Sequence, residues 1–203
     1  MRIVLKPAGL FVVLLAISVL AVFAFTRSPP SAKIVSPMVA PATPSPVTTP
    51  ANLAVNADML AKGANGLPDG WGHQWSGRGK VSASQDMTEG GDSPPCLRID
   101  TNDTDGQGQV AQMITVQPGE RVTVGGAVKA QGIGTFSLAA QFYDSKLSPV
   151  GFEHILMATP GAGWQTAEKT VTIPEGASTL GIVSYADGTG RGWVDDVSVT
   201  RQP

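Results

Sequence analysis

The chain has 203 residues, of which 15% are charged and 6% are aromatic, and it contains one cysteine, Cys96. Residues 1–50 hold four basic residues and no acidic one, so residues 51–203 carry 10 Lys and Arg against 16 Asp and Glu, a net charge of −6. This balance argues against a nucleic-acid partner, which requires a basic surface. A single cysteine excludes an intrachain disulfide, so the fold must be stable through its core alone.

An uncharged apolar segment covers residues 8–25. It is long enough for a short membrane span, and Arg2 and Lys6 before it favour a cytoplasmic N-terminus. Residues 1–27 are therefore predicted to be an uncleaved signal anchor or, alternatively, a signal peptide cleaved after Ala24. Both interpretations predict a protein that is membrane-anchored and faces the extracytoplasmic side, or that is secreted.

Proline dominates the next segment, with seven of the chain's 16 prolines between residues 28 and 50. Proline lacks a backbone donor and favours extended polyproline-type conformations. Residues 28–51 are therefore predicted to be a semi-rigid Pro/Ser/Thr-rich linker that holds the following domain away from a membrane or wall.

From residue 52 to the C-terminus, short segments with two-residue alternation are separated by Gly, Pro, Asn and Asp. Nine strands are predicted, over residues 80–84, 96–100, 109–116, 121–130, 134–143, 153–157, 168–173, 179–185 and 192–200. Turns are predicted at residues 117–120, 174–176 and 187–190. Regular short strands with such turns indicate an all-β antiparallel sandwich over residues 52–203.

The alternation also predicts which side chains face the core. The inward set is Leu138, Ala140, Phe142, Leu180 and Ile182, and the outward set is Ser137, Ala139, Gln141, Tyr143, Val183 and Tyr185. In the strand before them, Val122, Val124 and Val128 share one side, and Thr123, Ala127 and Lys129 share the other. An outward face with small residues beside an occasional aromatic fits a shallow binding surface, and it fits an ordinary solvent face equally well.

Seven segments occur in an order that resembles the jelly-roll carbohydrate-binding modules of the family-four-and-nine type, in the galactose-binding-like superfamily. They are Asn52-Leu53-Ala54-Val55-Asn56, Leu67-Pro68-Asp69-Gly70-Trp71, Cys96-Leu97-Arg98-Ile99, residues 112–119 with their Pro-Gly turn, residues 122–129, residues 164–174 and residues 193–199. The resemblance covers about residues 52–200 and implies a jelly-roll fold. It implies a ligand less strongly, because this fold serves many functions.

Asp195 is the carboxylate most informative about chemistry. Alternation from the core-facing Val197 points Asp195 inward, and a buried carboxylate requires compensation. A structural Ca²⁺ ion held by Asn56, Asp58 and Asp195 would supply it, since calcium takes oxygen ligands. The alternative is an aspartate bonded by backbone N–H groups where the first and last strands cross. The resemblance implies a calcium-binding glutamate where this chain has Leu60, and with that glutamate missing both alternatives stay open.

Sugar recognition requires aromatic faces for the ring and planar polar groups for its hydroxyls. Trp75, in the polar segment 72–77 predicted as a loop, is the first stacking candidate, with packing within the loop as the alternative. Gln141, Tyr143 and Tyr185 follow, because their parity points them outward. Three other tryptophans match positions that are usually core in the family: Trp71, Trp164 and Trp193.

No catalytic residue is predicted, because the sequence contains two histidines, His73 and His154, and none of the common hydrolase or phosphate-loop motifs. We therefore expect a non-catalytic extracytoplasmic carbohydrate-binding module. Its partners would be a glycan or cell-envelope polysaccharide, and a membrane through the N-terminal segment. The alternative is a structural or protein-interaction sandwich without a sugar site. A small hydrolase using Asp195 or His73 is a third interpretation.

Overall fold

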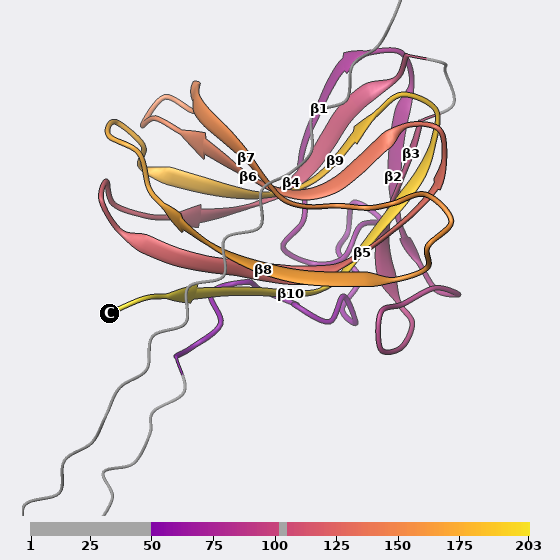
Figure 1. The fold of residues 1–203 in the computed structure, drawn as a ribbon, viewed down its shortest axis with the longest axis horizontal. Coiled ribbons are helices and arrows are strands. Elements are labelled where there is room, and N and C mark those ends of the chain that lie inside the picture. The colour runs from indigo at the N-terminus through magenta and orange to yellow at the C-terminus, as the bar shows by residue number, and fades with distance from the viewer. Residues whose placement is uncertain (1–49, 102–104) are drawn as a thin grey trace, which may run out of the picture. The chain divides into compact units, whose positions relative to one another are not determined.

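The computed structural model describes residues 50–101 and 105–203, which belong to the unit Val47–Pro203. These residues form ten antiparallel strands in two sheets (Figure 1). The strands are β1 (His73–Arg78), β2 (Val81–Asp86), β3 (Cys96–Thr101), β4 (Gln107–Thr115), β5 (Arg121–Gly132), β6 (Thr135–Tyr143), β7 (Pro149–Met157), β8 (Gln165–Thr172), β9 (Thr179–Asp187) and β10 (Gly190–Arg201). The predicted all-β sandwich is confirmed for this part of the chain.

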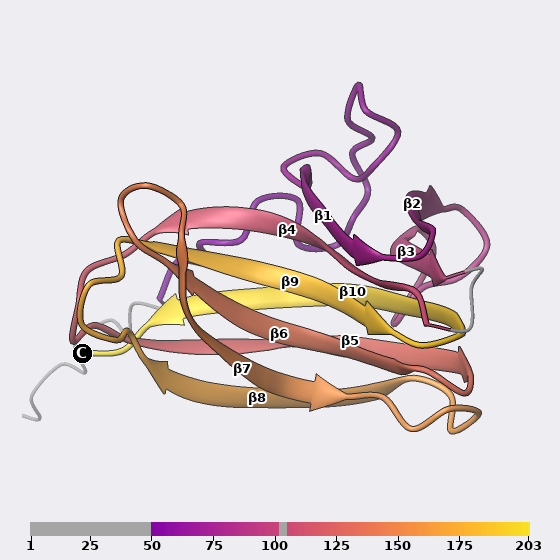
Figure 2. The same ribbon diagram turned by 90° about the horizontal axis from the view of Figure 1, so that it is seen from above.

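Each sheet contains five strands, in the orders β1-β4-β9-β6-β7 and β2-β3-β10-β5-β8. Figure 2 looks onto the first sheet, with β1 and β7 at its two edges and β9 at its centre. Pairing across it is in register, so that Trp75, Gln109, Tyr185 and Ser137 lie opposite one another on consecutive strands. Side chains from four strands are thereby aligned on one outer face.

The core lies between the two sheets. All five side chains predicted to face inward are buried in it, which confirms that assignment of faces. The shared side of Val122, Val124 and Val128 also faces the core. Trp71 also belongs to this core, as predicted. Trp164, however, is only half-buried and lies outside the core cluster, so its prediction as a core residue is wrong.

Nine of the ten strands overlap the nine predicted ones, and the predicted turns connect them. At two of these turns, Gly119 and Gly176 have φ angles of 79° and 81°, a conformation that glycine adopts without steric cost. Strand β1 is the exception, because the segment 72–77 was predicted to be a loop. The glycines and polar residues of this segment give no alternation of apolar and polar side chains from which a strand could be predicted.

A bulge in β10 changes the predicted orientation of its first half. The pairing with β5 shifts register between Asp195 and Ser198, and Asp196 has a φ of 50°. Because of this extra residue, Val194 and Val197 both point into the core although they are three positions apart. The inward placement of Asp195 is therefore wrong: the carboxylate is buried on the outer face of its sheet.

The loop formed by residues 87–95 covers that outer face. Gly91 N donates a hydrogen bond of 2.8 Å to Asp195, and Glu89 pairs with Lys129 at 2.7 Å. The Lys129 ammonium lies 5.1 Å from the ring centroid of Trp193. Trp193 is thus buried, but beneath this loop rather than between the sheets.

Residues 50–72 contain no strand and are fixed by backbone and side-chain hydrogen bonds. Asn52 Nδ2 donates to Val197 O at 3.0 Å, and Asn52 Oδ1 accepts from Val199 N at 2.8 Å, which attaches the segment to β10. Gln112 joins Val55 in the same two-bond manner, at 2.7 and 2.8 Å. Asn52 thereby links the start of the domain to its last strand.

The predicted signal anchor, residues 1–27, and most of the predicted linker lie outside the described residues. Within residues 50–101 and 105–203, the structure contains no helical segment with the length and hydropathy that a membrane span requires.

Candidate functional site

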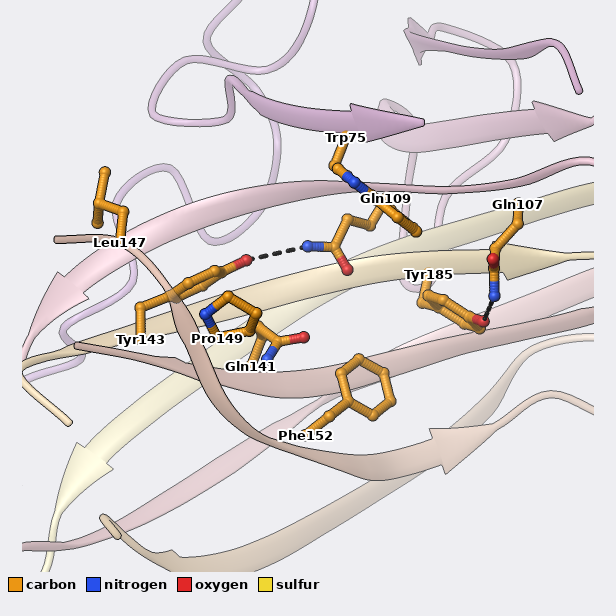
Figure 3. Close-up of a pocket in the computed structure, with 9 residues that line it drawn as sticks. All are labelled: Trp75, Gln107, Gln109, Gln141, Tyr143, Leu147, Pro149, Phe152 and Tyr185. Carbon is orange, nitrogen blue, oxygen red and sulfur yellow. Dashed lines mark hydrogen bonds between the residues drawn. The ribbon is translucent and has the colours of Figure 1, made fainter. Parts of the chain in front are cut away.

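A groove of about 540 Å³ lies on the outer face of the β1-β4-β9-β6-β7 sheet (Figure 3). Its lining residues are Trp75, Gln107, Gln109, Gln141, Tyr143, Leu147, Pro149, Phe152 and Tyr185. Every strand of the sheet contributes to them, because the register aligns outward-facing side chains of neighbouring strands. We call this site the groove below.

All four residues selected from the sequence for sugar contact line the groove: Trp75, Gln141, Tyr143 and Tyr185. The sequence reasoning missed Gln107, Gln109 and Phe152. Extending the two-residue alternation of the predicted strand 109–116 towards its N-terminal end would have placed Gln107 and Gln109 on the same outward face. The strand predicted over residues 153–157 began four residues late, which left Phe152 outside it.

Two exposed aromatic side chains form opposite sides of the groove. Trp75 on β1 is 47% exposed and Phe152 on β7 is 40% exposed, and Figure 3 shows them on either side of the central strands. The Trp75 ring lies close to Gly77, where an added Cβ would come within 2.4 Å of it. Gly77 therefore leaves the space that the indole occupies along the edge strand.

Tyr143 supports the groove rather than offering an exposed face, because it is only 4% exposed. Its ring lies over Gly181, where a Cβ would approach a ring carbon to 2.9 Å. Its hydroxyl accepts a 3.0 Å hydrogen bond from Gln109 Nε2. Burial raises the pKa of Tyr143, so its hydroxyl keeps its proton at physiological pH.

Tyr185 lies at the other end of the groove within a polar network. Gln107 Nε2 donates to the Tyr185 hydroxyl at 2.7 Å, and that hydroxyl donates to Asp187 at 3.1 Å. Arg78 closes the network through a 2.9 Å bond to Gln107 and a 2.5 Å ion pair with Asp187. Burial, aided by the Asp187 charge, raises the pKa of Tyr185, so it too stays protonated.

The side-chain amide of Gln141 is also held in place, since its Nε2 donates a 2.5 Å hydrogen bond to Gly151 O on the neighbouring strand β7. The floor of the groove therefore consists of amides and hydroxyls whose positions are fixed by neighbouring groups. None of the nine lining residues carries a charge. Such a lining can bind an uncharged polyhydroxylated molecule, and it offers no carboxylate or imidazole for general acid or base catalysis.

The three predicted calcium ligands already accept hydrogen bonds. Asn56 Oδ1 accepts from Ala61 N at 2.8 Å, and Asp58 Oδ1 accepts from Leu60 N at 3.5 Å. Asp195 accepts from two backbone N–H groups, those of Gly91 at 2.8 Å and its own neighbour Asp196 at 2.9 Å.

Burial nevertheless raises the pKa of Asp195 to about 6, against the effect of these two bonds, and the charges of Asp196 and Asp58 raise it further. Among the described residues, no group of three or more His, Cys, Asp or Glu side chains could hold a metal ion. The calcium site stays a prediction.

Comparison of the sequence with protein-family models and with curated proteins gives no match. Solved structures do match the fold. The CBM22-1 xylan-binding domain from Paenibacillus barcinonensis Xyn10C superimposes with a TM-score of 0.50 and 12% identity, covering 71% of this chain and 91% of that one. TmCBM61, solved in complex with beta-1,4-galactotriose, gives 0.51 and 14%, covering 75% and 99%.

The enzymatically active domain of bacteriophage CBA120 tailspike protein 4 gives a TM-score of 0.54 and 15% identity, and the match covers 74% of this chain. The chain spans only about a fifth of that domain, since 21% of it is covered. Identities this low show the fold alone. The described residues therefore have the jelly-roll sandwich fold found in CBM22 and CBM61 carbohydrate-binding modules.

Proposed function

We propose that this protein is a non-catalytic carbohydrate-binding module that binds an uncharged glycan chain in the groove. The observation that carries the proposal is the combination of two exposed aromatic rings, Trp75 and Phe152, with a fixed floor of amides and hydroxyls between them. Aromatic faces suit the C–H side of a sugar ring, and the amides suit its hydroxyl groups.

The neutral lining gives the proposed ligand its chemical class. A uronic acid or sulfated sugar buried here would require a cationic partner from the lining, which has none. Arg78 is close by, but it is already paired with Asp187. An uncharged polysaccharide avoids this desolvation penalty.

The fold supports this function. Two modules of the same fold are named for xylan binding or were solved with beta-1,4-galactotriose. The finer assignment to the family-four-and-nine type is our proposal from the seven sequence segments. A cell-envelope polysaccharide is the ligand we favour, because the apolar segment at residues 8–25 and the proline-rich linker would hold the module outside the cytoplasm, close to a membrane.

A structural calcium ion near Asp195 is a separate proposal. It is supported by a carboxylate that is 1% exposed and lies close enough to Asp58 and Asp196 for their charges to raise its pKa. The two backbone N–H groups that bond Asp195 support the alternative of an aspartate that needs no ion.

A glycan array followed by calorimetric titration tests the proposed function. We expect wild-type protein to bind at least one neutral glycan, and Trp75→Ala and Phe152→Ala each to lower the affinity about tenfold, equivalent to about 1.4 kcal/mol. Ile133→Ala is the matched control, because Ile133 is 90% exposed on the β5–β6 turn and contributes nothing to the groove.

Absence of binding to every neutral glycan would overturn the proposal, as would equal affinities in wild type and both aromatic variants. Recovery of a specific protein partner that sugars do not displace would favour the alternative, a protein-interaction sandwich.

A further inference from the structure

Three rings pack together beside the groove. Phe152 and His154 on β7 have ring centroids 4.9 Å apart at 84°, and Phe152 and Tyr185 are 5.4 Å apart at 60°. His154 and Tyr185 complete the cluster at 5.9 Å and 69°. Edge-to-face pairs at these separations are attractive. Phe152, on the edge strand of the sheet, therefore packs against both His154 and Tyr185.

The imidazole of His154 has a fixed position in this cluster. Its Nδ1 lies 2.9 Å from the hydroxyl of Ser137, which is 1% exposed on the neighbouring strand β6. A buried hydroxyl that cannot turn to water orients the ring strongly, because breaking this bond would leave a buried polar group unpaired. Because His154 is bonded to Ser137 on β6 and its ring contacts Phe152, it fixes the position of Phe152 relative to β6. Phe152 in turn lines the groove.

We propose that His154 is a positioning residue for glycan binding: its neutral imidazole, held by Ser137, keeps Phe152 and Tyr185 in the arrangement that binds the ligand, so that acid weakens binding. This inference rests on the proposed function of the groove. His154 itself is not among the lining residues.

Burial and the charge of Lys169 favour the neutral form of His154. From β8, Lys169 Nζ lies 3.5 Å from the His154 carbonyl oxygen. On β7 itself, Glu153 is paired with Lys169 at 2.6 Å, and on β9 the Tyr185 hydroxyl and Asp187 bond each other while Asp187 pairs with Arg78. Ser137, from β6, does not titrate. Burial first and the Lys169 charge second lower the pKa of His154.

Protonation would place a cation where the ring is partly buried and already close to Lys169. The imidazolium gains hydration by turning towards water, and Phe152 and Tyr185 then lose the ring that packs against both of them. By linkage, the affinity for a glycan that needs the neutral state falls by at most about tenfold per pH unit below the pKa of His154.

The test is calorimetric titration of xylohexaose and β-1,4-galactotriose at pH 7.5, 6.5, 5.5 and 5.0. For a sugar that binds at pH 7.5, we expect the wild-type affinity to be constant above the titration midpoint of His154 and to fall by up to about tenfold per pH unit below that midpoint. His154→Phe keeps an aromatic ring but cannot titrate, so its affinity should not depend on pH. His73→Phe, which replaces the other histidine, should keep the wild-type pH dependence.

A ligand-free measurement separates this inference from the proposed function. In NMR titrations from pH 8 to 5, the ring signals of Phe152 and Tyr185 should shift with the same midpoint as the His154 imidazole. They should stay constant in His154→Phe. If neither sugar binds, the choice of ligand fails and these ring signals still decide the inference. Ring signals that ignore the titration of His154, or pH-independent binding by wild type, would overturn it.

Discussion

Replacing Asp195 with asparagine should change how the stability of this protein depends on pH. Asp195 has a pKa of about 6 in the folded state, against 3.8 for an unperturbed aspartate. Between these two values the folded protein binds more protons than the unfolded chain, so the contribution of Asp195 to stability falls as pH rises. Asparagine is neutral throughout and removes this contribution.

The magnitude follows from the two pKa values. The difference of about two units, at about 1.4 kcal/mol per unit, is mostly expressed above pH 4, and it gives a loss of about 2.5 kcal/mol for the wild type between pH 4 and pH 7. Asparagine also presents an NH₂ group to one of the N–H donors of Gly91 and Asp196, which has its own cost. That cost does not depend on pH, so it shifts the curve of the variant without changing its slope.

Urea unfolding of both proteins at pH 4, 5, 6 and 7, in EDTA, measures the effect. The free energy of unfolding of wild type minus that of Asp195→Asn should fall by about 2.5 kcal/mol across this range. A difference that is constant or rises with pH would refute the reasoning. If this difference rises with pH only when calcium replaces EDTA, a bound cation has lowered the pKa of Asp195. That result would support the proposed calcium site.

Three further substitutions or treatments test other parts of the fold. Gly181→Ala should displace the ring of Tyr143, with a loss of about 1–3 kcal/mol in urea unfolding and weaker glycan binding; unchanged stability and affinity would contradict the packing described for this strand. Asn52→Ala removes two hydrogen bonds to β10 and should cost about 1–3 kcal/mol by the same measurement, whereas a neutral effect would show that the segment is held otherwise. Cys96 is buried and its pKa is raised by burial, so a thiol reagent should label it only after unfolding; rapid labelling of native protein would contradict this.

Most of the sandwich could be predicted from its sequence because burial on one face imposes alternation. Val122, Val124 and Val128 on β5, and Leu180 and Ile182 on β9, alternate with polar or small residues, and all five are buried. The same argument identified Gln141 and Tyr185 as outward-facing, and both line the groove. Whether a residue has an odd or even position in a strand determines the face on which its side chain lies, and this holds wherever the strand is regular.

The prediction failed where a strand is irregular. In β10, the core-facing Val194 and Val197 are three residues apart, whereas regular alternation would require an even spacing. This odd spacing is the sign in the sequence of the bulge that leaves Asp195 on the outer face. Strand β1 has no alternation of apolar residues to read, because edge strands bury little. That Trp75 and Phe152 lie opposite each other depends on the pairing of five strands, which a single sequence does not specify.

The central claim, that the groove binds a neutral glycan, is tested most directly by an NMR titration with the glycan that the array identifies. The indole signal of Trp75 and the side-chain amide signals of Gln107, Gln109 and Gln141 should shift as sugar is added. The indole signal of Trp193, beneath the loop of residues 87–95, should not shift. Shifts centred on Trp193 and that loop, with none in the groove, would contradict the claim.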